Sequence, residues 1–190
     1  MTNHRTETRK ERYQKKFDTA NQYPIELCTI NFQVEENVAF VIRSAAAFGA
    51  STVNIIGTIP ERKELMRRSG TTQDLVKLNQ FPNVNKFLSY IKENNIHLIS
   101  AEMCEEAVSI HDYNFPFDRK ICIVTGHETC GISSDILFNS DAIIYIPMPG
   151  RGFNLNTSVT SALITYEVIR QYETKHQDLQ KMWKNIIINE

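Results

Sequence analysis

The chain of 190 residues lacks several features that assign a protein to a class at once. It has no apolar run long enough to cross a membrane, and its polar amino-terminal segment does not resemble a signal peptide. Its four cysteines form no C-x-x-C pair, and no second pair of ligands with zinc spacing accompanies His127 and Cys130. We therefore expect a reduced, cytoplasmic protein without a membrane segment or a metal site.

Net charge is also small, because 21 Lys and Arg residues against 22 Asp and Glu residues give −1 at pH 7. The molecule as a whole therefore lacks the basic character of many nucleic-acid-binding domains. Basic side chains gather in two places, each of which could hold phosphates or form the solvated side of a helix with mixed charges. They are Arg5, Arg9, Lys10, Arg12, Lys15 and Lys16 in the first cluster, and Arg62, Lys63, Arg67 and Arg68 in the second.

Short apolar runs alternate with amphipathic stretches along most of the chain. The runs are continuous rather than alternating, which is typical of parallel strands covered on both faces. They are residues 25–30, 52–57, 96–100, 120–125 and 142–146. Residues 37–48, 84–94 and 157–172 have helical spacing, and the last of these carries Val159, Leu163, Tyr166, and Ile169 or Arg170 on one side. This alternation predicts an α/β fold with a mainly parallel sheet and helices on both faces.

Both ends of the chain differ from this pattern. Residues 1–22 are polar and basic, and we expect an amino-terminal extension there. Residues 23–172 form the predicted domain, and residues 173–190 are predicted to form a last helix. Its apolar residues, which could serve packing or a dimer contact, are Leu179, Met182, Trp183 and Ile186.

The segment from Ile143 to Ala162, IIYIPMPGRGFNLNTSVTSA, is the most informative part of the sequence. An apolar strand leads into a loop with Pro, Met and Gly, and a helix follows from Asn156-Thr157-Ser158. Ligands of open α/β sheets bind at loops that follow the carboxyl ends of strands. Taken alone, the segment fits an ordinary strand, turn and capped helix equally well.

Two further segments make this loop specific. NVAFVIRSAAAFG occupies residues 37–49, and IVTGHETCGI occupies residues 123–132. Together with IYIPMPG and NLNTSV of the loop, in this order and at these separations, they resemble the three motifs of the SpoU/TrmH family of RNA methyltransferases, in the SPOUT class. The resemblance covers residues 25–170, nearly the whole chain apart from its ends.

The resemblance implies a trefoil knot in the carboxyl-terminal half and a pocket for S-adenosylmethionine (SAM) between the second and third motif loops. Apolar side chains of the third motif suit the adenine face, and backbone groups around Gly126 suit its polar edge. The cofactor-binding residues implied are Thr125, Gly126, His127, Gly131, Ile146, Met148, Leu155 and Asn156.

The implied reaction is methyl transfer to a ribose 2′-hydroxyl of tRNA or rRNA. The family assigns the arginine of the first motif, here Arg43, to that hydroxyl and the neighbouring phosphate. Because a guanidinium stays protonated, Arg43 suits a phosphate clamp and a developing alkoxide better than the role of base. The implied catalytic residues are Arg43, Glu128, Asn154 and Asn156. The candidate RNA contacts are Asn37, Arg43, Arg67, Arg68 and Ser158.

Two of the motifs depart from the family pattern. The second motif reads His127-Glu128-Thr129 in place of the common Asn-Glu-Gly, and Asn154 stands where a Ser is usual. Losing the glycine restricts the loop, although Thr129 fits if its φ stays negative. These changes leave room for a protein that binds SAM or RNA as a regulator and does not transfer a methyl group.

The resemblance also implies a homodimer with active sites shared across the interface. Arg43 would then act opposite the partner's SAM pocket. A different alternative is an ordinary nucleotide-binding enzyme of flavodoxin-like topology. The lack of a Gly-rich phosphate loop after the first strand argues against it.

Overall fold

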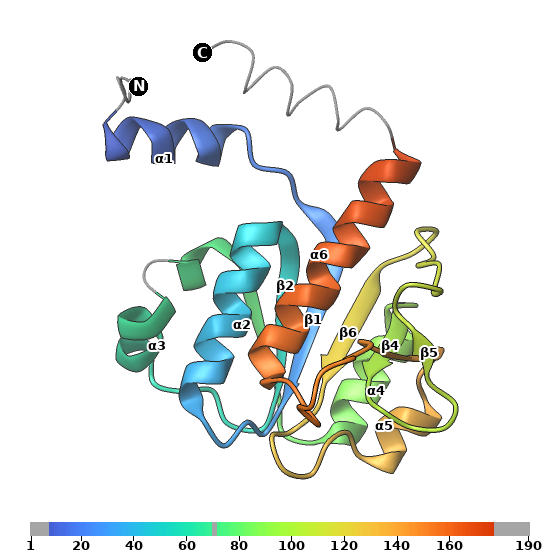
Figure 1. Cartoon of the computed structure of the whole chain (residues 1–190). Coiled ribbons are helices and arrows are strands. Elements are labelled where there is room, and N and C mark those ends of the chain that lie inside the picture. Colours follow the sequence, from blue (N-terminus) through green and yellow to red (C-terminus); the bar gives the residue numbers. More distant parts are fainter. Residues whose placement is uncertain (1–7, 70–71, 177–190) are drawn as a thin grey trace.

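The structure is a computed structural model that describes residues 8–69 and 72–176. Its centre is a parallel sheet of seven strands in the order β3-β2-β1-β6-β4-β7-β5 (Figure 1). The strands are β1 (Tyr23–Ile30), β2 (Ala50–Ile56), β3 (Lys77–Phe81), β4 (His97–Ala101), β5 (Val108–Ser109), β6 (Ile121–Thr125) and β7 (Ala142–Tyr145). Every pairing between neighbouring strands is parallel, which confirms the predicted fold class.

Helices cover both faces of this sheet, whereas α1 (Arg9–Asp18) extends away from it (Figure 1). The other helical elements are α2 (Glu35–Phe48), α3 (Arg62–Ser69), the 3-10 turn η1 (Thr72–Leu75), α4 (Val84–Glu93), α5 (Ser134–Phe138) and α6 (Thr157–Lys175). On one face α2 and α6 lie side by side over the central strands (Figure 1), and their buried side chains belong to one hydrophobic core. On the other face, a second core contains Phe87 and Ile91 of α4 and Ile136 of α5.

The five predicted strands and the three helices predicted within residues 23–172 are all present, and no end differs from the prediction by more than three residues. Two strands went unpredicted, and both lie at the outer edges of the sheet. The strand β3, KLNQF, is partly exposed and largely polar, and β5 has only two residues. Edge strands of this kind carry little apolar signal, because only part of each is covered by the core.

The buried side of α6 is not the side that the spacing of its large apolar residues indicates. Val159, Leu163 and Tyr166 are exposed by 45%, 45% and 57%. The buried residues of α6 are instead Thr157, Ser158, Ser161, Ile164, Thr165, Val168 and Ile169, of which only Ile169 belongs to the predicted face. Four of these seven are Ser or Thr, so the buried face of α6 looks partly polar in sequence while its exposed face looks apolar.

Strand order separates this fold from a flavodoxin-like sheet, in which the strands run 2-1-3-4-5. Here β6 lies between β1 and β4, although it follows both in the chain. The trefoil knot itself stays a prediction, as do the domain boundaries at residues 22 and 172. The apolar stripe predicted at Leu179–Ile186 lies outside the described residues. Among those that are described, no helix is both long and apolar enough to span a membrane.

Candidate active site

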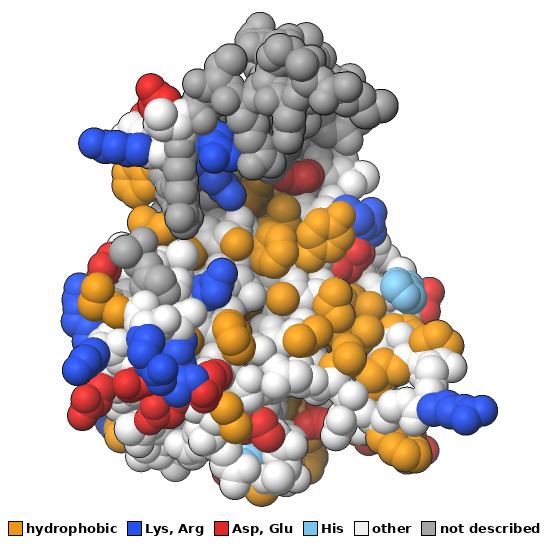
Figure 2. Space-filling model, turned by 60° about the vertical axis from the view of Figure 1, so that its left-hand side comes forward, with side chains coloured by type: hydrophobic (Ala, Val, Ile, Leu, Met, Phe, Trp, Pro, Cys, Tyr) orange, Lys and Arg blue, Asp and Glu red, His pale blue; other side chains and the backbone are white. Residues whose placement is uncertain are grey.

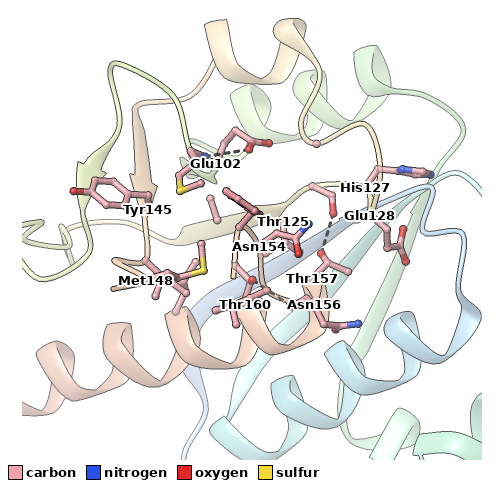
Figure 3. Close-up of a pocket in the computed structure, with 18 of the residues that line it drawn as sticks. Glu102, Thr125, His127, Glu128, Tyr145, Met148, Asn154, Asn156, Thr157 and Thr160 are labelled. Carbon is pink, nitrogen blue, oxygen red and sulfur yellow. Dashed lines mark hydrogen bonds between the residues drawn. The ribbon is translucent and has the colours of Figure 1, made fainter. Parts of the chain in front are cut away.

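A cavity of about 540 Å³ opens where β4, β6 and β7 end and α6 begins (Figure 3). Three segments form it: the chain after β4, the loop of residues 125–131, and the segment of residues 144–157. All eight residues predicted to bind the cofactor line this cavity, and so do Glu128 and Asn154. The carboxyl ends of the strands thus bring together residues that are far apart in sequence, as expected for an α/β sheet.

The loop after β6 closes on itself as a tight hairpin. The amide of His127 donates to the carbonyl of Gly131, and the amide of Gly131 donates back to His127, both at 3.0 Å. Gly131 has a φ of +66°, and a Cβ at Gly126 would lie 2.7 Å from the carbonyl carbon of Gly131. Both glycines are therefore required by backbone geometry, since a side chain at either one would strain or displace the hairpin.

The side chain of His127 supplies the turn inside this hairpin. Its Nδ1 accepts hydrogen bonds from the amides of Thr129 at 3.1 Å and Cys130 at 3.4 Å, and contacts the Thr129 hydroxyl at 3.1 Å. An Asn side chain makes the same kind of turn by accepting from the amide two residues ahead. His127 therefore replaces the usual Asn by acting as an equivalent acceptor. The φ of Thr129 is not positive, so Thr129 fits at the position where the family commonly has Gly.

Glu128 points out of the hairpin toward the start of α2. Its carboxylate accepts hydrogen bonds from the amides of Gln33 at 3.0 Å and Val34 at 3.4 Å and from the side-chain amide of Asn37 at 2.6 Å. The N-cap residue of α2 is Val34, whose side chain makes no capping hydrogen bond. Glu128 therefore caps this helix from another part of the chain.

These hydrogen bonds also determine the acidity of Glu128. Partial burial raises its pKa, but the hydrogen bonds from Asn37 and from backbone amides, including those of Gln33 and Val34, outweigh that effect. The net result is a pKa below the ordinary value of 4.5. Glu128 is therefore an anionic anchor in the described structure, and no contact joins it to Arg43 there.

Asn37 and Asn156 extend this anchor to the third motif. The side chain of Asn156 donates to Oδ1 of Asn37 at 3.0 Å, and its own Oδ1 accepts from the amide and hydroxyl of Ser158 at 2.9 and 2.6 Å. Asn156 is thus the N-cap of α6. The chain Glu128–Asn37–Asn156–Ser158 ties all three motifs together. Asn37 and Ser158, predicted to contact RNA, are 3% and 6% exposed and serve this network.

Arg43 lies on a different surface. It is exposed on α2 and lines a second cavity, of about 530 Å³, between α2 and α6. The other lining residues are Phe40, Ser44, Phe48, Asn156, Ser158, Val159, Ala162, Leu163 and Tyr166. Arg43 is not among the residues that line the first cavity. Asn156 is the one described residue that lines both cavities.

Arg67 and Arg68 lie on α3, away from both cavities. Arg67 pairs with Glu64 at 2.8 Å, and Arg68 pairs with Glu36 and Glu64. Basic side chains stand among acidic ones on the lower left of Figure 2 as well. These ion pairs match the mixed-charge helix of the sequence analysis, and the phosphate contact predicted for the two arginines stays a prediction. No cluster of metal-ligating side chains occurs within residues 8–69 and 72–176.

Sequence reasoning missed several residues of the first cavity. They are Ala101, Glu102, Met103, Thr129, Ile144, Tyr145, Phe153, Thr157, Thr160 and Ile164. Among them, Glu102 directly follows the end of β4, and the rule that drew attention to the other two loops applies to this position too. Thr157 has a structural role, since its hydroxyl donates to the carbonyl of Gly126 at 2.9 Å and fixes α6 against the hairpin.

Comparisons with known proteins agree with this architecture. A tRNA (guanosine(18)-2′-O)-methyltransferase of Escherichia coli is 27% identical over 150 residues, which cover 79% of this chain and 65% of the relative. The chain therefore spans slightly less than two thirds of that relative. The enzyme of the same name from Thermus thermophilus is 27% identical over 170 residues, covering 88% and 84% of the two chains.

The fold has solved counterparts as well. The SpoU methyltransferase AviRb from Streptomyces viridochromogenes, solved with the cofactor AdoMet, superposes with a TM-score of 0.71. It is 20% identical, and the match covers 82% of this chain and 63% of AviRb. The sequence model of the SpoU rRNA Methylase family matches residues 24–166, and the chain belongs to that family.

Proposed function

We propose that this protein is a cytoplasmic SAM-dependent methyltransferase that modifies a ribose 2′-hydroxyl of tRNA or rRNA. The observation that carries the proposal is the cavity in which the loops of the second and third motifs meet, with the first motif hydrogen-bonded to both. The relatives named above act on tRNA, which supports RNA as the substrate.

The residues of the cavity fit SAM. A volume of about 540 Å³ is in the range of small-molecule sites. Ile146, Met148 and Leu155 provide apolar walls, and Glu102 contributes a carboxylate. Among the described residues that line the cavity, none is Lys or Arg. Such a lining favours a cationic ligand, and SAM carries a sulfonium and an ammonium group.

When bound, SAM supplies the methyl group as an activated sulfonium substituent. Transfer of this methyl group to the 2′-oxygen would break the carbon–sulfur bond, leave a neutral thioether and pass the hydroxyl proton to water. The protein must hold the hydroxyl in line and stabilise the negative charge that develops on its oxygen. Arg43 suits this task, because its guanidinium can clamp the adjacent phosphate while remaining charged. The network from Glu128 to Asn156 holds α2 in place and thus positions Arg43.

The separation of Arg43 from the first cavity supports a homodimer. Large apolar side chains surround Arg43, and Phe40, Val159, Leu163 and Tyr166 are exposed by 44–57%. Figure 2 shows hydrophobic side chains gathered on this side of the molecule, and exposed apolar groups of this extent mark protein interfaces. A second copy docked here would bury them and bring Arg43 toward the partner's SAM pocket.

Two measurements test the proposal. Calorimetric titration with SAM reports cofactor binding, and transfer of a tritiated methyl group to total tRNA and rRNA reports activity. We expect Arg43→Ala to abolish transfer with SAM affinity changed by less than about twofold, and Lys92→Ala on the opposite face to match the wild type. Wild-type transfer by Arg43→Ala would show that Arg43 is not catalytic.

The same assays separate the enzyme from a regulator. SAM binding without label in any RNA contradicts the proposed activity and supports a binding protein of the same fold. If label is found, ribose methylation mapped by mass spectrometry in cells with and without the protein identifies the nucleotide.

A further inference from the structure

Glu102 lies outside the three motifs and places an acidic group at the first cavity. It follows β4 directly, and its backbone amide still pairs with the carbonyl of Ile144 on β7 at 3.0 Å. Figure 3 shows it on the side of the cavity opposite the helix that carries Thr157 and Thr160. Its backbone is therefore held by the sheet, and its side chain reaches the ligand cavity from a rigid element.

The carboxylate of Glu102 has a fixed position. One oxygen accepts from the amide of Ile132 at 2.9 Å and the other from the amide of Met103 at 3.0 Å. A Cβ at Gly131 would lie 2.6 Å from Oε2 of Glu102, so the glycine leaves the room that the carboxylate occupies. A carboxylate offers about four lone-pair sites, so two amide donors leave capacity for a ligand.

The negative charge of Glu102 has no cationic partner in the described part of the chain, where no Lys, Arg or His lies within ion-pair distance of it. Glu128 differs, because its charge faces the amino-terminal end of α2 and three hydrogen-bond donors. Glu102 is thus the carboxylate of the cavity whose charge remains available to a ligand.

We propose that Glu102 makes this cavity selective for a cationic ligand over its neutral counterpart. The proposal rests on SAM being the cofactor. Methyl transfer converts the sulfonium of SAM to the neutral thioether of S-adenosylhomocysteine, and the positive charge leaves as the proton of the hydroxyl. A carboxylate in the cavity therefore attracts the cofactor more strongly than the product, and it favours exchange of one for the other after each turnover.

This effect belongs to binding and not to the chemical step. The positive charge on sulfur declines toward the transition state, so a nearby carboxylate stabilises the bound cofactor more than the transition state. Glu102 is accordingly a specificity-determining residue. Removal of the Glu102 carboxylate should alter the ratio of the affinities for SAM and S-adenosylhomocysteine. Loss of Arg43, in contrast, should abolish methyl transfer and leave SAM affinity nearly unchanged.

The test compares three ligands: SAM, S-adenosylhomocysteine, and sinefungin, which carries an ammonium group in place of the sulfonium. We expect Glu102→Gln to weaken SAM and sinefungin about tenfold, equivalent to about 1.4 kcal/mol, and S-adenosylhomocysteine less than about twofold. Glu102→Asp keeps the charge and should keep the wild-type ratio of affinities. Glu105→Gln is the matched control, an exposed carboxylate of the same segment outside the cavity lining.

Equal weakening of all three ligands by Glu102→Gln would overturn the proposal, because it would assign Glu102 either to the amides of Met103 and Ile132 or to the amino-acid ammonium that all three ligands share. Unchanged affinities would overturn it as well. The wild type gives an independent readout, since the preference for sinefungin over S-adenosylhomocysteine should fall with salt as the attraction is screened. A ratio unchanged by salt counts against the proposal. Failure of the wild type to bind any of the three refutes the proposed cofactor instead.

Discussion

Replacing Glu128 by Ala should destabilise the fold more than any exposed carboxylate does. The change removes the acceptor for the amides of Gln33 and Val34 and for the side chain of Asn37. Loss of a helix N-cap costs about 1 kcal/mol. Asn37 is 3% exposed, and a buried amide without its acceptor costs a further 1–3 kcal/mol or so.

Because Glu128 is itself only partly buried, water replaces some of what the mutation removes, and we expect the low end of this sum, about 2 kcal/mol. For a chain of this size that loss corresponds to a fall in melting temperature of about 4–8 °C. Urea unfolding followed by circular dichroism measures the free energy of unfolding directly. Glu128→Gln should lose roughly half as much, since its amide oxygen can still accept.

The matched control is Glu106→Ala, which removes an exposed carboxylate from a loop outside the cavity lining. It should change the free energy of unfolding by less than about 0.5 kcal/mol. A loss that small in Glu128→Ala itself, with an unchanged urea slope, would refute the capping role. It would also remove the basis for Glu128 as the residue that positions α2 and Arg43.

Three further perturbations probe separate parts of the structure. Hydrogen bonds hold the pKa of Glu128 below 4.5 against the opposing effect of burial. The wild type should therefore exceed Glu128→Gln in free energy of unfolding by its full amount above about pH 4.5, and this difference should shrink as the pH falls further. A difference that grows on acidification contradicts this. His127→Asn should keep SAM affinity within about threefold and His127→Ala should weaken it about tenfold, since only Asn can accept from the amide of Thr129; equal titrations for both would rule out the turn. Leu163→Asp should convert a dimer to a monomer in analytical ultracentrifugation, and a wild-type monomer at micromolar concentration would contradict the interface between copies.

Local patterns were sufficient to predict the layers of this fold. Continuous apolar runs predicted the buried strands, because a parallel strand covered on both faces must be apolar on both. The edge strand β3 was not predicted, since its sequence KLNQF is largely polar and none of its five residues is fully buried. The exposed face of α6 was also misleading, because Val159, Leu163 and Tyr166 are spaced like a core face.

The candidate site, too, could be predicted only in part from the sequence. The sequence alone determined two of the three segments that line the cavity, since motif order and the rule of strand carboxyl ends depend on chain position, and it missed the segment after β4. Tertiary structure alone decided what the individual side chains do: that Glu128 caps α2, that His127 takes the place of an Asn, that Arg43 lies outside the cavity, and that Glu102 lies at it. The physical reason is that hydrogen bonds and charge pairing depend on distances of a few ångströms between residues distant in the chain, and periodicity in a sequence contains no such distances.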